Sequence, residues 1–326
     1  MHISGIGIAY PKRKVDPWIE LAPSTNMSKD SLGEYLGCSS IRLSDPDCIE
    51  ERASRLALNA AREAIEISGL CLSDIDLIIS NNISSDYLDW QQSAFIAEQL
   101  GLHCPTFDIY AGCNSSGISL QTAVAILEAD ESISHILIAL AERLGGGTFP
   151  QFIADGACSW IVSRGCGSLE IIATKNVNET MPRLGLLPFG GVVKPFTPDT
   201  EFNGTWQDNV EISIEDYRTK LKPIFVQLTC APIVALCEER GVAIKDIAQF
   251  FIVHQQRGFN EKVLEHLGVD TCKSPLEYID DMGHISGFDV MITLKRAIED
   301  QKIVKDDLIA LIILGMGEYH TFLLRV

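Results

Sequence analysis

The stretch GLCLSDID (residues 69–76) is matched 172 positions later by GVAIKDIA (residues 241–248). At the same spacing, the apolar run 136–140 falls on the apolar run 308–312. A spacing that holds over about seventy residues indicates a duplicated unit. Two unrelated α/β segments that align by coincidence are the alternative.

On either side of these two stretches, the hydrophobic periodicity predicts helices and strands that follow one another in the same order in both halves. Predicted strands cover 1–10, 76–80, 134–140, 157–163, 169–175, 248–253, 308–314 and 321–326. Predicted helices cover 50–68, 90–100, 118–127, 212–240, 258–267 and 288–299. We therefore predict an α/β protein with two similar halves, residues 1–165 and 166–326.

Composition excludes several classes of protein. The chain of 326 residues is 46% hydrophobic and 21% charged, with a formal net charge of −18. No long basic run offsets that charge, so a nucleic-acid partner is not expected. No apolar run approaches the ~20 residues of a membrane span, and the first residues lack a signal-peptide pattern. A cytoplasmic location with no membrane partner is expected.

The ten cysteines are scattered and contain no C-x-x-C pair, which argues against a zinc ribbon or a disulfide framework. One of them stands out in DIYAGCNSSG (residues 108–117). Cys113 follows a small-residue turn and precedes a helix, and free N–H groups at a helix N-terminus favour a thiolate. Cys113 is therefore a candidate nucleophile, with a buried packing cysteine as the alternative.

The repeat predicts that two histidines lie close to this cysteine. At the 172-residue spacing Cys113 corresponds to Ile285, which follows His284, and His254 corresponds to Asn82 just beyond a strand end. If the halves pack with twofold pseudosymmetry, the turns that carry Cys113 and His284 face each other. A cysteine with two histidines favours nucleophilic acyl chemistry over a metal site, because zinc needs further ligands.

Five motifs in this order carry a family resemblance: YAGC (110–113), IADGA (153–157), VHQQ (253–256), MGHISG (282–287) and LGMG (314–317). Together they resemble the active-site motifs of the thiolase superfamily, in particular those of the type III β-ketoacyl-acyl-carrier-protein synthases. The resemblance covers almost the whole chain. It implies a duplicated five-layer α/β/α/β/α fold with two mixed sheets and a homodimer.

The resemblance also implies roles for single residues. Cys113 would accept an acyl group, and its backbone N–H with that of Gly315 would form the oxyanion hole. His254 would be the first catalytic histidine. His284 occupies a position where type III synthases carry Asn, so that the set resembles the Cys-His-His site of types I and II. An alternative is that His284 only packs.

The expected substrate pocket includes Trp90, Arg257 and Gly317. Trp90 follows a loop that, in the family, crosses the dimer interface and limits the partner's acyl pocket; a core role is the alternative. The stretch 34–42 lacks the Trp and Arg that clamp the adenine of coenzyme A in the family, and Arg257 ends a His-Gln-Gln-Arg run where the family has His-Gln-Ala-Asn. These departures argue against ordinary fatty-acid initiation and favour an enzyme of secondary metabolism.

The resulting hypothesis is a ketosynthase-like acyltransferase that forms an acyl-Cys113 thioester. It would pass the acyl group to a carbon nucleophile by Claisen condensation, with or without decarboxylation, in secondary metabolism or in fatty-acid-related synthesis. Coenzyme A or acyl carrier protein would deliver the acyl group, with no metal or other cofactor. Acyl transfer to an amine or hydroxyl is one alternative, and a weakly active partner subunit of a heteromeric ketosynthase is another.

Overall fold

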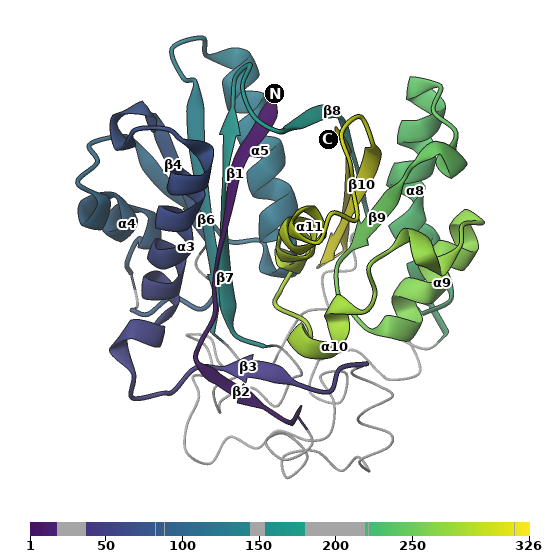
Figure 1. Ribbon diagram of the computed structural model, residues 1–326, viewed down its shortest axis with the longest axis horizontal. Coiled ribbons are helices and arrows are strands. Elements are labelled where there is room, and N and C mark those ends of the chain that lie inside the picture. Colours follow the sequence, from purple (N-terminus) through teal and green to yellow (C-terminus); the bar gives the residue numbers. More distant parts are fainter. Residues whose placement is uncertain are drawn as a thin grey trace.

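The computed structural model describes residues 1–17, 37–81, 83–87, 89–143, 154–179, 219–220, 222–315 and 317–326 (Figure 1). The strands are β1 His2–Ala9, β2 Arg13–Val15, β3 Ile41–Leu43, β4 Leu77–Asn81, β5 Thr106–Ile109, β6 His135–Glu142, β7 Gly156–Ser163, β8 Leu169–Asn178, β9 Gln249–Ile252, β10 Leu308–Gly315 and β11 Glu318–Arg325. The helices of at least five residues are α3 Ala53–Ser68, α4 Gln92–Leu100, α5 Ser115–Ala129, α8 Lys222–Arg240, α9 Arg257–Leu267, α10 Tyr278–Met282 and α11 Asp289–Glu299. Part of the predicted helix 212–240 and part of the stretch 34–42 lie outside the described residues.

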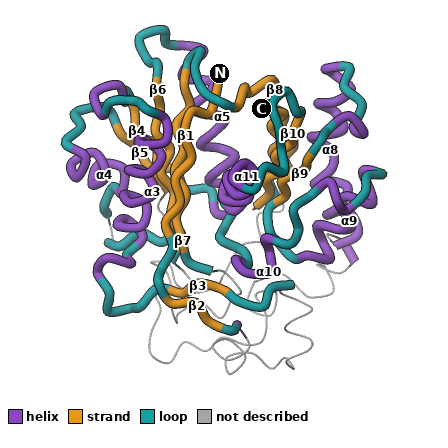
Figure 2. The backbone as a smooth tube through the Cα atoms, in the orientation of Figure 1, coloured by secondary structure: helices purple, strands orange, loops and turns teal. Residues whose placement is uncertain are grey.

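The main sheet has the strand order β5-β4-β6-β7-β1-β8-β11-β10-β9 (Figure 2). The first five strands come from one half and the last four from the other, and both parts mix parallel and antiparallel pairs. Among the described residues they join where His2 and Ile3 pair with Glu170 and Leu169, and the Ile171 N–H donates to the Met1 carbonyl beside these pairs. The two expected mixed sheets are thus present, but this short contact joins them into one.

The duplication is visible in the order of the elements. Reading outward from the β1–β8 junction, the strands of each half appear in the same sequence, which is the arrangement of a pseudo-twofold pair. Helices α3 and α8 end at residues 172 positions apart, Ser68 and Arg240. Each is closed by a glycine with positive φ, 70° at Gly69 and 65° at Gly241. One difference is that α10 stands where the first half has β5.

Three buried clusters define five layers. The central cluster places α5 and α11 between the inner faces of the two sheet halves, with Leu120 and Leu294 among its members. A second cluster packs α3 on the outer face of the first half, and a third packs α8 on the outer face of the second. Figure 1 shows α3 and α8 on opposite sides with α11 between them. This is the predicted α/β/α/β/α arrangement.

Two glycines let α3 lie unusually close to β1. A Cβ atom on Gly5 would stand 2.2 Å from the carbonyl oxygen of Ala64, and one on Gly7 would stand 2.0 Å from that of Ala60. The facing side of α3 is built from alanines that are almost fully buried. Small residues on both elements therefore fix the helix against the strand and anchor the outer layer of the first half.

The prediction that the chain divides at 165/166 places the boundary in the turn between β7 and β8. The three-residue strands β2 and β3 form a separate hairpin beyond the main sheet. Backbone N–H groups of Ser39 and Ser40 donate to the carbonyl of Asp280 in α10. The hairpin region is thereby tied to the element that leads into the His284 turn.

Candidate active site

Cys113 lies in a one-turn 3₁₀ segment, Gly112–Asn114, between β5 and α5. Gly112 has a φ of 54°, a conformation that glycine adopts readily and other residues rarely do. The neighbours of Cys113 are buried, whereas the cysteine keeps partial exposure. The turn therefore presents the sulfur at the start of a helix, where the sequence placed it.

The second half contributes the turn between α10 and α11, and this turn meets the first. A Cβ atom on Gly287 would stand 1.7 Å from the carbonyl oxygen of Cys113, so the two backbones touch. The hydroxyl of Ser116 donates to the Gly287 carbonyl at 2.7 Å. The ring of His284 forms a hydrogen bond with the Cys113 thiol. The structure thus brings Cys113 and His284 together.

Asp289, the first residue of α11, was not singled out from the sequence. Its side chain is fully buried, and its Oδ2 lies 2.8 Å from His284 Nδ1. The same carboxylate accepts the backbone N–H of His254 at 3.2 Å and that of Ile285 at 3.4 Å. The sequence offered one signal for Asp289: it is an acidic residue at an otherwise apolar helix start, five positions after His284.

The surroundings of His284 favour its protonated form. Burial alone lowers the pKa of the ring, but the hydrogen bond to Asp289, the contact with Cys113 and the charges of both outweigh it and raise the pKa to about 10. At neutral pH the ring is therefore an imidazolium. It can return a proton to a leaving group or donate a hydrogen bond to a developing oxyanion.

His254 lies beside this cluster, but its ring nitrogens have other partners. Nδ1 donates to the Gly283 carbonyl at 3.0 Å, and Nε2 lies 3.0 Å from the Thr293 hydroxyl. Burial lowers the pKa of His254, so the ring is neutral and Nε2 accepts. No described contact joins this ring to Cys113, and a direct catalytic role for His254 stays a prediction.

The glycines near the end of β10 approach the nucleophile turn. A Cβ atom on Gly315 would stand 2.8 Å from the Asn114 nitrogen and 3.0 Å from Cys113 Cβ, so only glycine fits there. Gly317 has a φ of 84° and accepts the Glu179 N–H at 2.7 Å. Their places in the oxyanion hole and the substrate pocket stay predictions, and Met316 between them lies outside the described residues.

The other two pocket candidates lie on different elements. The half-buried ring of Trp90 packs between Tyr87 and Phe95, with ring centroids 5.3 and 5.4 Å away. Arg257 begins α9, is largely exposed, and pairs with Glu261 at 3.1 Å. Neither side chain has a described contact with Cys113, and their pocket roles stay predictions.

Glu142, at the end of β6, is a second carboxyl that sequence reasoning missed. Burial raises its pKa to about 7, against the opposing effect of the Ser286 and Ser84 hydroxyls and of His284. Its Oε1 has no hydrogen-bond partner in the described part of the chain. This group is close enough to His284 to act on it electrostatically and titrates near neutrality.

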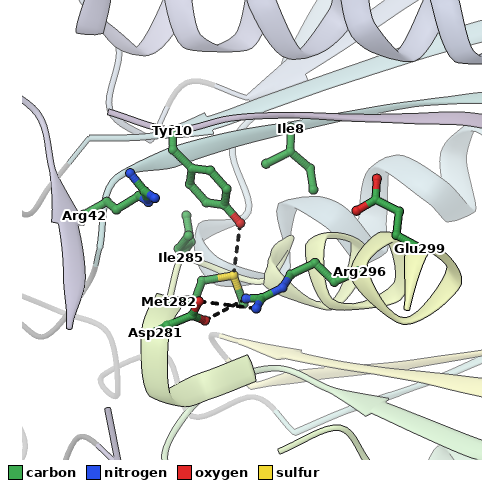
Figure 3. A pocket seen from close by; sticks show the side chains of 8 residues that line it. All are labelled: Ile8, Tyr10, Arg42, Asp281, Met282, Ile285, Arg296 and Glu299. Atoms are coloured by element: carbon green, nitrogen blue, oxygen red, sulfur yellow. Dashed lines mark hydrogen bonds and ion pairs between the residues drawn. The ribbon is translucent and has the colours of Figure 1, made fainter. Parts of the chain in front are cut away.

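A cavity of about 250 Å³ adjoins the His284 turn (Figure 3). Within it, the Tyr10 hydroxyl points to the Met282 sulfur at 3.5 Å, and Arg296 pairs with Asp281 at 2.7 Å. The lining residues are Ile8, Tyr10, Arg42, Asp281, Met282, Ile285, Arg296 and Glu299. Cys113 and His284 are not among these lining residues, whereas Met282 and Ile285, which flank His284 in the chain, are.

The described residues contain no group of three or more His, Cys, Asp or Glu side chains arranged to hold a metal ion. Among the same residues, no helix has both the length and the apolar character that a bilayer crossing needs.

Comparisons with known proteins agree with this architecture. Residues 237–324 match the family 3-oxoacyl-[acyl-carrier-protein (ACP)] synthase III C terminal. The chain is 27% identical over 300 residues to the acyl-CoA:acyl-CoA alkyltransferase of Xanthomonas campestris pv. campestris, covering 88% of this chain and 85% of that protein. It is 25% identical over 325 residues to a β-ketoacyl-[acyl-carrier-protein] synthase III of Lactobacillus helveticus, covering 91% and 90%.

The chain is similar to members of the thiolase superfamily over most of its length. Two solved structures show the same fold: 3-oxoacyl-[acyl-carrier-protein] synthase III from Aquifex aeolicus, with a TM-score of 0.77 at 21% identity, and a variant of OleA from Xanthomonas campestris, with a TM-score of 0.82 at 20% identity. Both matches cover all of this chain and at least 98% of the other. The relatives named here support an acyltransferase that is similar to the type III synthases.

Proposed function

We propose that Cys113 accepts an acyl group from an acyl thioester and passes it to a carbon nucleophile in a Claisen condensation. The observation that carries the proposal is the hydrogen bond between the Cys113 thiol and His284, whose other ring nitrogen binds the buried carboxylate of Asp289. This arrangement places the sulfur beside a ring that can hold its proton, and the thiolate is the reactive form of a nucleophilic cysteine.

In the first half-reaction, the thiol proton is held on the His284 imidazolium, and the sulfur attacks the thioester carbonyl. The backbone N–H groups of Cys113 and Gly315 would bind the oxyanion, since Gly315 packs directly on the turn. The tetrahedral intermediate expels the donor thiol, which takes the proton from His284. The product is an acyl-Cys113 thioester and a free thiol.

In the second half-reaction, a second acyl thioester becomes an enolate, either by losing carbon dioxide or by giving an α-proton to Nε2 of His284, which is neutral after the donor thiol has left. The enolate carbon attacks the acyl-Cys113 carbonyl, a carbon–carbon bond forms, and the Cys113 sulfur leaves. With the α-proton on its Nε2, His284 is again an imidazolium and pairs with the Cys113 thiolate that leaves; in the decarboxylative case this proton comes from solvent. His254 can contact the substrate only after its Nε2 gives up the Thr293 hydroxyl.

We further propose that coenzyme A, rather than acyl carrier protein, delivers the acyl group. Acyl carrier protein is acidic, and a chain with a net charge of −18 offers it a repulsive surface. The name of the Xanthomonas relative states acyl-CoA for both of its substrates. Loading rates with matched acyl-CoA and acyl-carrier-protein donors at low salt test this, and faster loading from the carrier protein would contradict it.

An acylation panel tests the central proposal. The protein is incubated with acyl-CoA thioesters of increasing chain length, and intact mass is measured. We expect a single acyl adduct that disappears in Cys113→Ser, followed by a β-ketoacyl product or its decarboxylated ketone once a second thioester is added. Absence of any Cys113-dependent adduct across the panel would remove the proposal.

Acyl transfer to an amine or hydroxyl is the second candidate, because the His284–Asp289 pair can also deprotonate a heteroatom acceptor. It predicts that acyl-Cys113 is discharged by amines or alcohols and not by acyl thioesters. A weakly active subunit of a heteromeric ketosynthase predicts instead that Cys113 is acylated only with a partner chain present. We expect a homodimer, and size-exclusion chromatography with light scattering of the acylated protein separates these cases.

A further inference from the structure

The carboxylate of Asp289 binds both histidines of the site, but through different groups. It reaches His284 at the ring nitrogen Nδ1, 2.8 Å away, whereas it reaches His254 only at the backbone N–H, 3.2 Å away. Asp289 also lies in the first turn of α11, where the helix dipole favours a negative charge. One buried charge therefore acts directly on one imidazole ring and not on the other.

The two rings differ in consequence. With Nδ1 of His284 on Asp289, the nitrogen left for the Cys113 thiol is Nε2. His254 has Nδ1 on the Gly283 carbonyl and Nε2 on Thr293, so both of its nitrogens are used inside the protein. Only His284 connects a buried carboxylate with the reacting sulfur.

We propose that Asp289 is a positioning residue that makes His284 the single proton-carrying histidine of this site. It fixes the ring with Nε2 toward Cys113 and balances the charge of the imidazolium. A buried aspartate does the same for the histidine of Ser-His-Asp triads, where it sets the tautomer and orientation without itself taking the proton. This role rests on the proposed function in one respect, that Cys113 is the reacting thiol.

Four groups face His284 and together set its pH dependence: Cys113 before α5, Glu142 at the end of β6, His254 after β9, and Asp289. Burial keeps His254 neutral, so it adds no charge. Glu142 gains a charge near neutrality and acts on His284 in the same direction as Asp289. Measurements in a Glu142→Gln background therefore isolate the contribution of Asp289.

Alkylation by iodoacetamide tests the proposal, because it reads the thiolate directly and needs no acyl donor. The rate at Cys113, located by peptide mapping, is measured from pH 6 to 9.5 for Asp289→Asn and Thr293→Val, each with and without Glu142→Gln. Asparagine keeps an acceptor for the backbone N–H groups and removes the charge. We expect Asp289→Asn to be slower at pH 6 on the order of 100-fold and to converge with the parent by pH 9.5. Thr293→Val should follow the parent throughout.

An Asp289→Asn profile that overlays the parent would overturn the proposal, as would an equal shift in Thr293→Val. Ring ¹⁵N NMR of the parent chain gives an answer even if Asp289→Asn does not fold, with His284→Asn and His254→Gln used for assignment. We expect His284 as imidazolium and His254 as neutral imidazole at pH 8; a neutral His284 refutes the proposal. A shifted alkylation profile without any acyl adduct would refute the proposed function and leave the role of Asp289 intact.

Discussion

The turn before α5 and the turn before α11 occupy equivalent places in the two halves, yet one carries Cys113 and the other His284. Helix α5 has no acidic residue in its first turn, and Cys113, which precedes the helix, stays partly exposed. The α11 turn begins with the buried Asp289, which binds His284. Duplication thus placed two similar helix starts face to face, and a single carboxylate on one side separates their chemistry.

The largest effect should come from replacing the histidine of the α11 turn. We expect His284→Asn to slow acylation of Cys113 on the order of 10³-fold, because proton transfer to and from the thiol is lost. His254→Gln should cost on the order of tenfold, since its ring has no described contact with the sulfur. Single-turnover acylation followed by intact mass measures both. Equal losses in the two variants would show that Asp289 does not distinguish the histidines.

The contact between the two turns can be broken without touching either reactive side chain. Gly287→Ala places a Cβ atom against the Cys113 carbonyl, at a native spacing of 1.7 Å. We expect the free energy of unfolding to fall by about 3 kcal/mol or more. Gly258→Ala in α9 is the matched control, because nothing lies within 4 Å of its Cβ position, and it should gain about 0.5 kcal/mol. Urea denaturation monitored by circular dichroism compares them, and similar stabilities would contradict the close approach.

The buried carboxyl of Glu142 makes the free energy of unfolding depend on pH. Its pKa is raised from 4.5 to about 7 in the folded protein, so the folded state holds the proton more tightly than the unfolded chain. The stability from this bound proton is fully present below pH 4.5 and is lost as pH rises through 7. Glu142→Gln, which cannot ionise, should therefore be more stable than the parent by about 3 kcal/mol at pH 8 and equal to it at pH 4. Exposed Glu128→Gln is the control, and a difference that does not grow with pH would contradict the assignment.

The smallest effect is expected from removing the hydrogen bond between the Thr293 hydroxyl and His254 Nε2. Thr293→Val removes the hydroxyl beside Nε2 and should lower the free energy of unfolding by about 1–2 kcal/mol, because a buried ring nitrogen loses its partner. Thermal unfolding by calorimetry measures this. Unchanged stability would mean that Thr293 does not hold the ring, and His254 would regain the freedom to face substrate.

Much of the fold was predictable because its evidence is local or periodic. The alanine pattern predicted α3 within three residues of its observed bounds, and the terminal glycines Gly69 and Gly241 predicted where α3 and α8 end. The constant spacing predicted the duplication and, through it, the meeting of the Cys113 and His284 turns. The join of the two sheet halves was not predictable, because two residue pairs between β1 and β8 leave no pattern in the sequence.

The site was predictable in part for a related reason. Cys113 and His284 stand in distinctive motifs, whereas Asp289 resembles any acidic residue at a helix start until its burial is known. The orientation of the His254 ring could not be predicted from the sequence either. Its ring turns toward Gly283 and Thr293 because of tertiary contacts, and residue spacing carries no information about ring direction.

The brevity of the β1–β8 join has a mechanical consequence. Two paired residues at the sheet junction cannot by themselves set how the halves align. The alignment depends instead on the central helices and on the backbone contact between Gly287 and Cys113. One of the points that join the halves is therefore the contact beside Cys113 itself. A small displacement of one half against the other would lower the reactivity of the Cys113 thiol before either half unfolded. The reactivity of Cys113 is therefore a sensitive measure of how the two halves are aligned.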